Sequence, residues 1–162
     1  MIEIVLEKIA SGGLLTPDKI LPVTGETDKK TLIFRLVQTA CRGLERVDVA
    51  EAAAQVLKRE EGLGTALETG LAIPHARLEE LDDFAAAAAV LSRPLTDEKH
   101  LKKPTKVMFL FLSPDNPSFF KRHLRLLSFL AETFQPALIE ELAGEQNPAR
   151  VAEILARVNM VK

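Results

Sequence analysis

The chain has very little cysteine: Cys41 is the only one among 162 residues. A single thiol cannot form a disulfide within the chain, and the first residues lack the basic start and apolar core of a signal peptide. Cys41 lies among apolar residues at helical spacing, where a buried, unreactive thiol is more common than a nucleophile. We therefore expect a cytoplasmic protein without a cysteine nucleophile.

Long apolar runs and long runs of positive charge are also missing. No apolar stretch approaches the roughly 18 to 20 residues that a helix needs to span a bilayer, so direct membrane insertion is not expected. The 21 basic and 23 acidic residues give a formal charge of -2, and no long basic run indicates a nucleic-acid surface. An integral membrane protein is excluded, and nucleic acid is not an expected partner.

The common motifs of several enzyme classes are absent as well. The sequence has no GxSxG elbow, P-loop, HExxH or CxxC pair. The motifs that usually identify a hydrolase, a nucleotide-binding protein or a common zinc protein are therefore missing. The histidines His75, His100 and His123 are 25 and 23 residues apart, which matches no pattern of metal ligands. We expect no metal and no cofactor, and we interpret His100, in a charged stretch, as a surface residue.

What is present indicates one globular domain. The length suffices for a sizeable core, and 47% hydrophobic with 27% charged residues is ordinary for a soluble protein. There is no internal repeat or low-complexity linker. We expect a single domain over residues 1–162, although residues 1–8 receive no firm assignment.

Helical periodicity is clearest in two regions. Apolar residues at helical spacing predict a helix that begins at Lys29 and stops at about Gly43, and the capping-box pattern of Asp48 and Glu51 predicts another to about Glu61. Towards the C-terminus, Asn–Pro pairs and an apolar periodicity predict helices after 116, over 136–142 and after 147. For the first of these, the expected buried face is Phe120, Leu124, Leu127, Ala131 and Phe134.

Three strands are predicted. Residues 71–73 form a brief apolar run that places His75 at a strand end, and 107–112, VMFLFL, suits a strand buried on both faces. Residues 84–91 hold five consecutive alanines, whose local preference is helix, but small side chains suit a central strand closely covered by helices. Short loops are expected around Pro22 and over 113–117.

His75 is the candidate for chemistry. Pro74 fixes its own φ and biases Ile73 towards extended geometry, so the approach to the histidine is stiff. One nitrogen of a neutral imidazole can attack phosphorus while the other is held by a hydrogen bond. Positive charge from Arg59 and N–H groups from the 62–70 loop could stabilise phosphoryl oxygens. A structural histidine at a turn, and an Arg59 that only pairs with an acidic neighbour or faces water, are the alternatives.

Two motifs resemble a known family. Arg59-Glu60, a Gly/Thr-containing loop and GLAIPH over 70–75 are similar to R-E...S-T-G-I-G-N-G-I-A-I-P-H, and HLRLLSFLA over 123–131 is similar to H-L-x-x-L-S-x-L-A. Both belong to enzyme IIA domains of the bacterial phosphoenolpyruvate-dependent phosphotransferase system, in their mannitol/fructose class with its nitrogen-regulatory branch. The resemblance spans nearly the whole chain. It implies an α/β fold in which helices sandwich a mixed central β-sheet.

The resemblance also implies a function. His75 would take a phosphoryl group from the phosphohistidine of HPr and pass it to an enzyme IIB domain or, in a regulatory relay, to a regulatory target protein. That role is that of a phosphotransferase. At matching positions Arg59 would help neutralise the phosphoryl group, His123 would lie beside His75 as a hydrogen-bond donor, and Thr65 would contribute loop hydrogen bonds.

The loop before His75 departs from the family signature. Residues 64–70 read GTALETG where the family has STGIGNG, so two glycines and a serine are replaced. Glu68 would oppose a phosphoryl dianion by on the order of 1 to 4 kcal/mol at about 4 Å, and Ala66 lacks glycine's access to positive φ. The alternative function is therefore a weakly or non-phosphorylated regulatory protein-binding module of the same fold.

Overall fold

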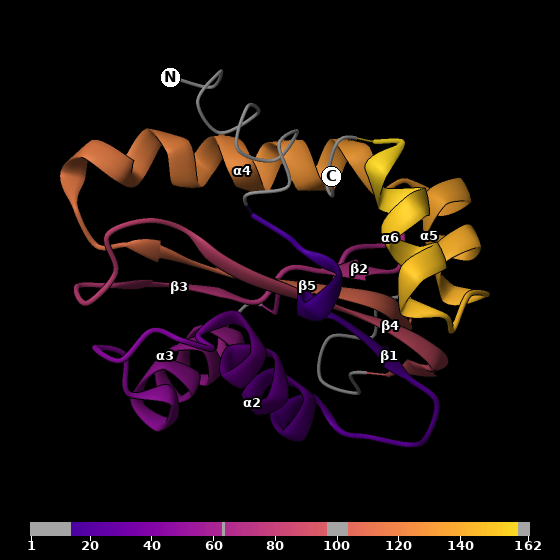
Figure 1. Ribbon diagram of the computed structural model, residues 1–162, viewed down its shortest axis with the longest axis horizontal. Coiled ribbons are helices and arrows are strands. Elements are labelled where there is room, and N and C mark those ends of the chain that lie inside the picture. Colours follow the sequence, from indigo (N-terminus) through magenta and orange to yellow (C-terminus); the bar gives the residue numbers. More distant parts are fainter. Residues whose placement is uncertain (1–13, 63, 97–103, 159–162) are drawn as a thin grey trace.

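A β-sheet of five strands lies between two layers of helices in the computed structural model, which describes residues 14–62, 64–96 and 104–158 (Figure 1). One layer holds α2 and α3, and the other holds α4, α5 and α6 (Figure 1). These helices are α2 (Lys29–Ala40), α3 (Val49–Glu61), α4 (Phe120–Thr133), α5 (Pro136–Ala143) and α6 (Pro148–Ala156). The predicted fold class, a mixed sheet sandwiched by helices, is confirmed.

The order of the strands in the sheet is β1-β4-β5-β2, and β3 also pairs with β5. β1 is parallel to β4, β4 is antiparallel to β5, and β2 and β3 are both parallel to β5. The strands are β1 (Ile20–Val23), β2 (Leu71–Ala72), β3 (His75–Leu78), β4 (Ala85–Leu95) and β5 (Thr105–Pro114), and single 3-10 turns form η1 (Pro17–Lys19) and η2 (Pro117–Phe119). None of the described helices is long and apolar enough to cross a bilayer.

The alanine-rich segment is a strand, as predicted. Ala86 and Ala88 of β4 pack into the hydrophobic cluster under α4, α5 and α6, whereas Ala87 and Ala89 pack into the cluster under α2 and α3. All four are almost completely buried. Because these side chains are short, both helix layers can approach the middle of the sheet closely, and this tertiary packing overrides the helical propensity of alanine.

The predicted loops were partly wrong. Pro22 lies within β1, where a proline is tolerated because β1 is an edge strand and needs N–H donors on one side only. Ser113 and Pro114 extend β5, which stays paired with β3 up to Leu78. The histidine that was expected at the end of a strand opens the next one: His75 is the first residue of β3. The expectations for residues 1–8 and His100 fall outside the described residues.

The predicted buried face of α4 was also partly wrong. His123, Leu126 and Leu130 are the buried residues of this helix, while Phe120 and Leu124 are each 47% exposed. Residues three and four apart line up along a helix, so α4 carries two neighbouring apolar rows. The row that contains His123 is the one that packs on the sheet. His123 therefore lies inside the protein.

Replacing Gly70 with alanine is expected to lower the free energy of unfolding by about 2 kcal/mol. Gly70 has a φ of +102, and an added Cβ would lie 3.0 Å from Cγ2 of Ile139 on α5. Gly25→Ala is the matched control, because a Cβ there would meet nothing within 4 Å and its φ is not positive. Urea unfolding followed by circular dichroism measures both, and equal midpoints would contradict the expectation.

Candidate functional site

His75 is buried, with 8% of its surface exposed, and is held in one orientation. Its Nδ1 lies 2.7 Å from the carbonyl oxygen of Ile73. A carbonyl oxygen can only accept, so Nδ1 carries the proton and donates it. The ring stacks on Phe111 of β5, with 5.4 Å between the ring centroids and 10° between their planes. A neutral His75 in this position has its lone pair on Nε2.

The local sequence explains why the ring is placed there. Pro74 interrupts the ladder between β2 and β3, and its carbonyl accepts from the backbone N–H of Phe111 at 3.1 Å. β3 then pairs in parallel with β5, in the register that sets His75 opposite Phe111. Residues opposite each other on paired strands project to the same face of the sheet. The stacking of the two rings follows from that register.

The surroundings favour a neutral His75. Burial lowers its pKa below the usual value of an imidazole, opposed by the hydrogen bond to Ile73, which favours the protonated ring. The charge of Arg59, at the end of α3, lowers the pKa further, and that of Glu60 raises it. Arg59 is therefore close enough to act on the ring electrostatically. A neutral imidazole near pH 7 is the form that can act as a nucleophile.

His123 projects from α4 against the edge of the His75 ring. The two ring centroids are 5.2 Å apart at an angle of 65°, and His123 is 6% exposed. Its Nδ1 lies 2.6 Å from the hydroxyl oxygen of Ser113. When that hydroxyl donates to Nδ1, the proton of the neutral imidazole resides on Nε2. His123 can then donate a hydrogen bond from Nε2.

Acid should destabilise the fold through His123. Burial, and then the charges of His75 and Arg77, lower the pKa of His123 to about 4. Between about pH 6.5 and pH 4 the unfolded chain holds this proton and the folded chain does not, so stability is lost as the pH falls. The lowered pKa of His75 acts in the same direction.

The expected loss from His123 alone is about 2 kcal/mol between pH 7 and pH 5. Urea unfolding of the wild type and His123→Gln at both pH values measures it. The variant should lose less stability than the wild type over this interval. An equal loss in both proteins would show that His123 is not the group responsible.

The loop before His75 is fastened to α3 by Glu60. Thr65 donates both its hydroxyl and its backbone N–H to the Glu60 carboxylate, the latter at 3.3 Å. Glu60 is 5% exposed and forms an ion pair with Lys29 at 2.8 Å. The carbonyl of Thr65 accepts from the N–H of Ile73 at 3.4 Å. Thr65 thus fixes the backbone next to His75, and its own donors are already engaged by Glu60.

Glu68 lies away from the histidine. It is exposed in a turn whose last residue, Gly70, accepts through its carbonyl from the N–H of Val107, at the beginning of β5. His75 pairs with Phe111 instead, four residues further along β5, which corresponds to roughly 13 Å of strand. The backbone of this turn therefore lies beside the beginning of β5, away from the position at which His75 pairs with the same strand.

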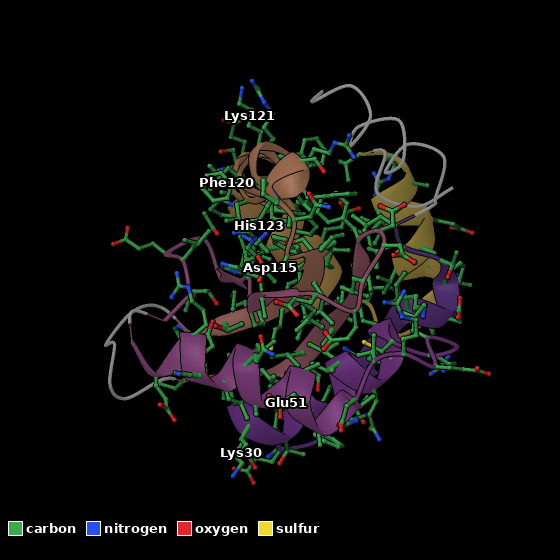
Figure 2. The ribbon with its side chains drawn as sticks, turned by 90° about the vertical axis from the view of Figure 1, so that its left-hand side faces the viewer. Lys30, Glu51, Asp115, Phe120, Lys121 and His123 are labelled. Carbon is green, nitrogen blue, oxygen red and sulfur yellow. The ribbon has the colours of Figure 1, made fainter. Side chains whose placement is uncertain are left out.

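Sequence reasoning missed three residues of this site: Phe111, Ser113 and Arg77. Alternate residues of a strand share a face, so Phe111 and Ser113 on β5 lie beside His75 and Arg77 on β3. The alternation was visible in the sequence, but the pairing of β3 with β5 was not. Figure 2 shows Phe120, His123 and Asp115 following one another from α4 towards the sheet.

The site can therefore offer a nucleophilic nitrogen next to a second imidazole and an arginine. Within the described residues, no group of three or more His, Cys, Asp or Glu could hold a metal ion. Residues 14–158 match the family described as phosphoenolpyruvate-dependent sugar phosphotransferase system, EIIA 2. The chain belongs to this family. The predicted resemblance is confirmed.

Individual members of the EIIA family and its structural neighbours support the assignment. The chain is 30% identical over 146 residues to a nitrogen regulatory protein of Bradyrhizobium diazoefficiens, covering 88% of this chain and 92% of that protein. It is similar to the crystal structure of nitrogen regulatory protein IIA-Ntr from Neisseria meningitidis, with a TM-score of 0.76, 28% identity and coverage of 89% and 97%. The mannitol enzyme IIA of Escherichia coli, in complex with phosphorylated enzyme IIB, shares the fold, with a TM-score of 0.67, 18% identity and coverage of 86% and 95%.

Proposed function

We propose that this EIIA domain is a phosphoryl carrier. His75 accepts the phosphoryl group from a phosphorylated HPr-type protein and passes it to an enzyme IIB domain or, in a regulatory relay, to a target protein. The observation that carries the proposal is the hydrogen bond from Nδ1 of His75 to the carbonyl of Ile73 at 2.7 Å. It assigns the lone pair of a neutral, buried imidazole to Nε2, which is the atom that must attack phosphorus.

The transfer exchanges one N–P bond for another. The lone pair of Nε2 of His75 attacks phosphorus, and the N–P bond of the donor phosphohistidine breaks. A donor ring that is protonated on its second nitrogen leaves as a neutral imidazole. His75 keeps its Nδ1 proton and becomes the positively charged phosphoimidazole, with that proton still donated to Ile73. Passage to the next protein reverses these roles.

The side chains around His75 stabilise the phosphoryl group while it is transferred. Phosphoryl transfer needs charge balance and positioning more than covalent chemistry. Arg59, whose charge already reaches the His75 ring, neutralises the phosphoryl oxygens. His123 donates from Nε2 while Ser113 holds its other nitrogen. Thr65 acts on the backbone before His75 and, in this arrangement, not on phosphate directly.

The names of similar proteins support a carrier with either kind of recipient. Two are nitrogen regulatory proteins, and one is a mannitol enzyme IIA bound to phosphorylated enzyme IIB. The substituted 64–69 loop is the observation that favours the second candidate, a weakly or non-phosphorylated binding module of the same fold.

The deciding experiment is intact-mass measurement after incubation with phosphoenolpyruvate, enzyme I and HPr. We expect one phosphoryl adduct that is stable in base, lost in acid and located on the peptide that contains His75. A wild-type protein that stays unmodified, with an HPr from the same source organism, would exclude the carrier role and favour the binding module.

A further inference from the structure

Arg77 is the second cation beside the histidine pair. It follows His75 by two residues in β3, so both side chains project to the same face of the sheet. Its register partner on β5 is Ser113, which in turn contacts His123. The charge of Arg77 lowers the pKa of His123, as that of Arg59 lowers the pKa of His75. The two arginines therefore act on different members of the pair.

The guanidinium of Arg77 is poorly satisfied in the described structure. Its Nη2 lies 3.5 Å from a carboxylate oxygen of Asp115 and 3.4 Å from the carbonyl oxygen of Asn116, both long for a charged hydrogen bond. Its Nε–H is buried without a hydrogen-bond partner among the described residues. A buried donor without an acceptor is destabilising, because it has lost its hydrogen bonds to water. An anionic ligand that accepts a hydrogen bond from this N–H would supply the partner that it lacks.

The surroundings of Arg77 hold it at the site and still allow a change of partner. The guanidinium carbon lies 5.2 Å from the centroid of the Phe120 ring, a cation–π distance that keeps the side chain along α4. Asp115 is half exposed, so its pairing with Arg77 is weak and replaceable. The side chain of Arg77 is 31% exposed, so it reaches both the buried pair and the surface.

We propose that Arg77 binds the phosphoryl group carried by His75. Its Nε–H and one Nη–H donate to phosphoryl oxygens in the forked geometry that suits phosphate, and Asp115 gives up its contact. The phosphoryl group carries close to two negative charges, and Arg59 with Arg77 supplies two positive ones. Arg77 makes and breaks no covalent bond, and this role rests on the proposed carrier function of His75.

The test uses phosphoramidate, a small phosphoryl donor that needs no protein partner. The full chain is labelled as wild type, Arg77→Gln, Arg77→Lys and Arg46→Gln, and intact mass gives the labelling rate and the lifetime of the adduct. Arg46 is the matched control, because it pairs with Asp82 at 3.6 Å and is more exposed. Arg77→Gln should slow labelling about 10- to 100-fold, Arg77→Lys should recover part of the rate, and Arg46→Gln should equal the wild type.

Loss of a merely structural arginine would not change the lifetime of the adduct when variants of equal stability are compared. Asp115→Asn, which removes the competing carboxylate and keeps Arg77, is expected to lengthen that lifetime. Equal rates in Arg77→Gln and wild type would overturn the role of Arg77 and leave the carrier function intact. A wild-type protein that neither phosphoramidate nor phosphorylated HPr modifies would overturn both.

Discussion

Replacing His75 with alanine is expected to remove the phosphoryl adduct completely. The reason is the assignment of protons in the site: among the histidines that the structure describes, Nε2 of His75 alone combines a free lone pair, a fixed ring and the charge of a nearby arginine. His123 cannot substitute for it, because its Nδ1 is engaged with Ser113 and the proton of its neutral ring is expected on Nε2. Intact mass after incubation with phosphorylated HPr measures the loss.

The control for this experiment is His123→Ala. It removes a hydrogen-bond donor and not the nucleophile, so labelling should persist and slow by about 10²-fold. Urea unfolding at pH 7 must show that both variants are folded. Persistent labelling of His75→Ala, with an adduct mapped to His123, would reverse the roles assigned to the two histidines.

Replacing Glu60 with alanine is expected to be the most destabilising single change near the site, at about 2 to 3 kcal/mol. Glu60 is a buried carboxylate that accepts from Thr65 twice and from Lys29 once. Its removal leaves the Thr65 N–H and hydroxyl without their acceptor. The side chain of Lys29 is 29% exposed and can regain water, which keeps the loss below that of a fully buried ion pair.

Phosphorylation should weaken along with stability in Glu60→Ala. The carbonyl of Thr65 holds Ile73, and the carbonyl of Ile73 holds His75, so a loosened loop reduces the fraction of molecules with the ring correctly placed. Glu61→Ala is the matched control, because Glu61 is the next residue on α3 and is exposed. Urea unfolding and the phosphoramidate rate measure the two effects. Equal stability of the Glu60 and Glu61 variants would contradict the assigned role of this carboxylate.

Elements whose structure depends on local pattern were predictable from the sequence. The cap at Asp48, the apolar strand around Phe109 and the short C-terminal helices follow from residue spacing alone. The alanine strand needed a further argument, that small side chains permit close helix packing. His75 and its proline could be singled out because a stiff backbone before a histidine is a local feature.

The features that could not be predicted from the sequence depend on how elements pack against one another in the fold. α4 has two adjacent apolar rows, and only packing on the sheet decides that Leu126 is buried and Leu124 exposed. The contact of Ser113 with His123 joins β5 to α4, and no spacing in the sequence encodes it. The position of Glu68 likewise became clear only from the register of Gly70 and Val107. Contacts between residues on different strands or layers can be predicted only once the fold is known.

The hydrogen bond from His75 to its own chain, two residues back, has a chemical consequence beyond orientation. An imidazole can be phosphorylated on either nitrogen, giving two different isomers of phosphohistidine. Because Nδ1 is occupied by the carbonyl of Ile73, the carrier would form the Nε2 isomer alone. The regiochemistry of the energy-rich bond would then be determined by the backbone before any partner arrives.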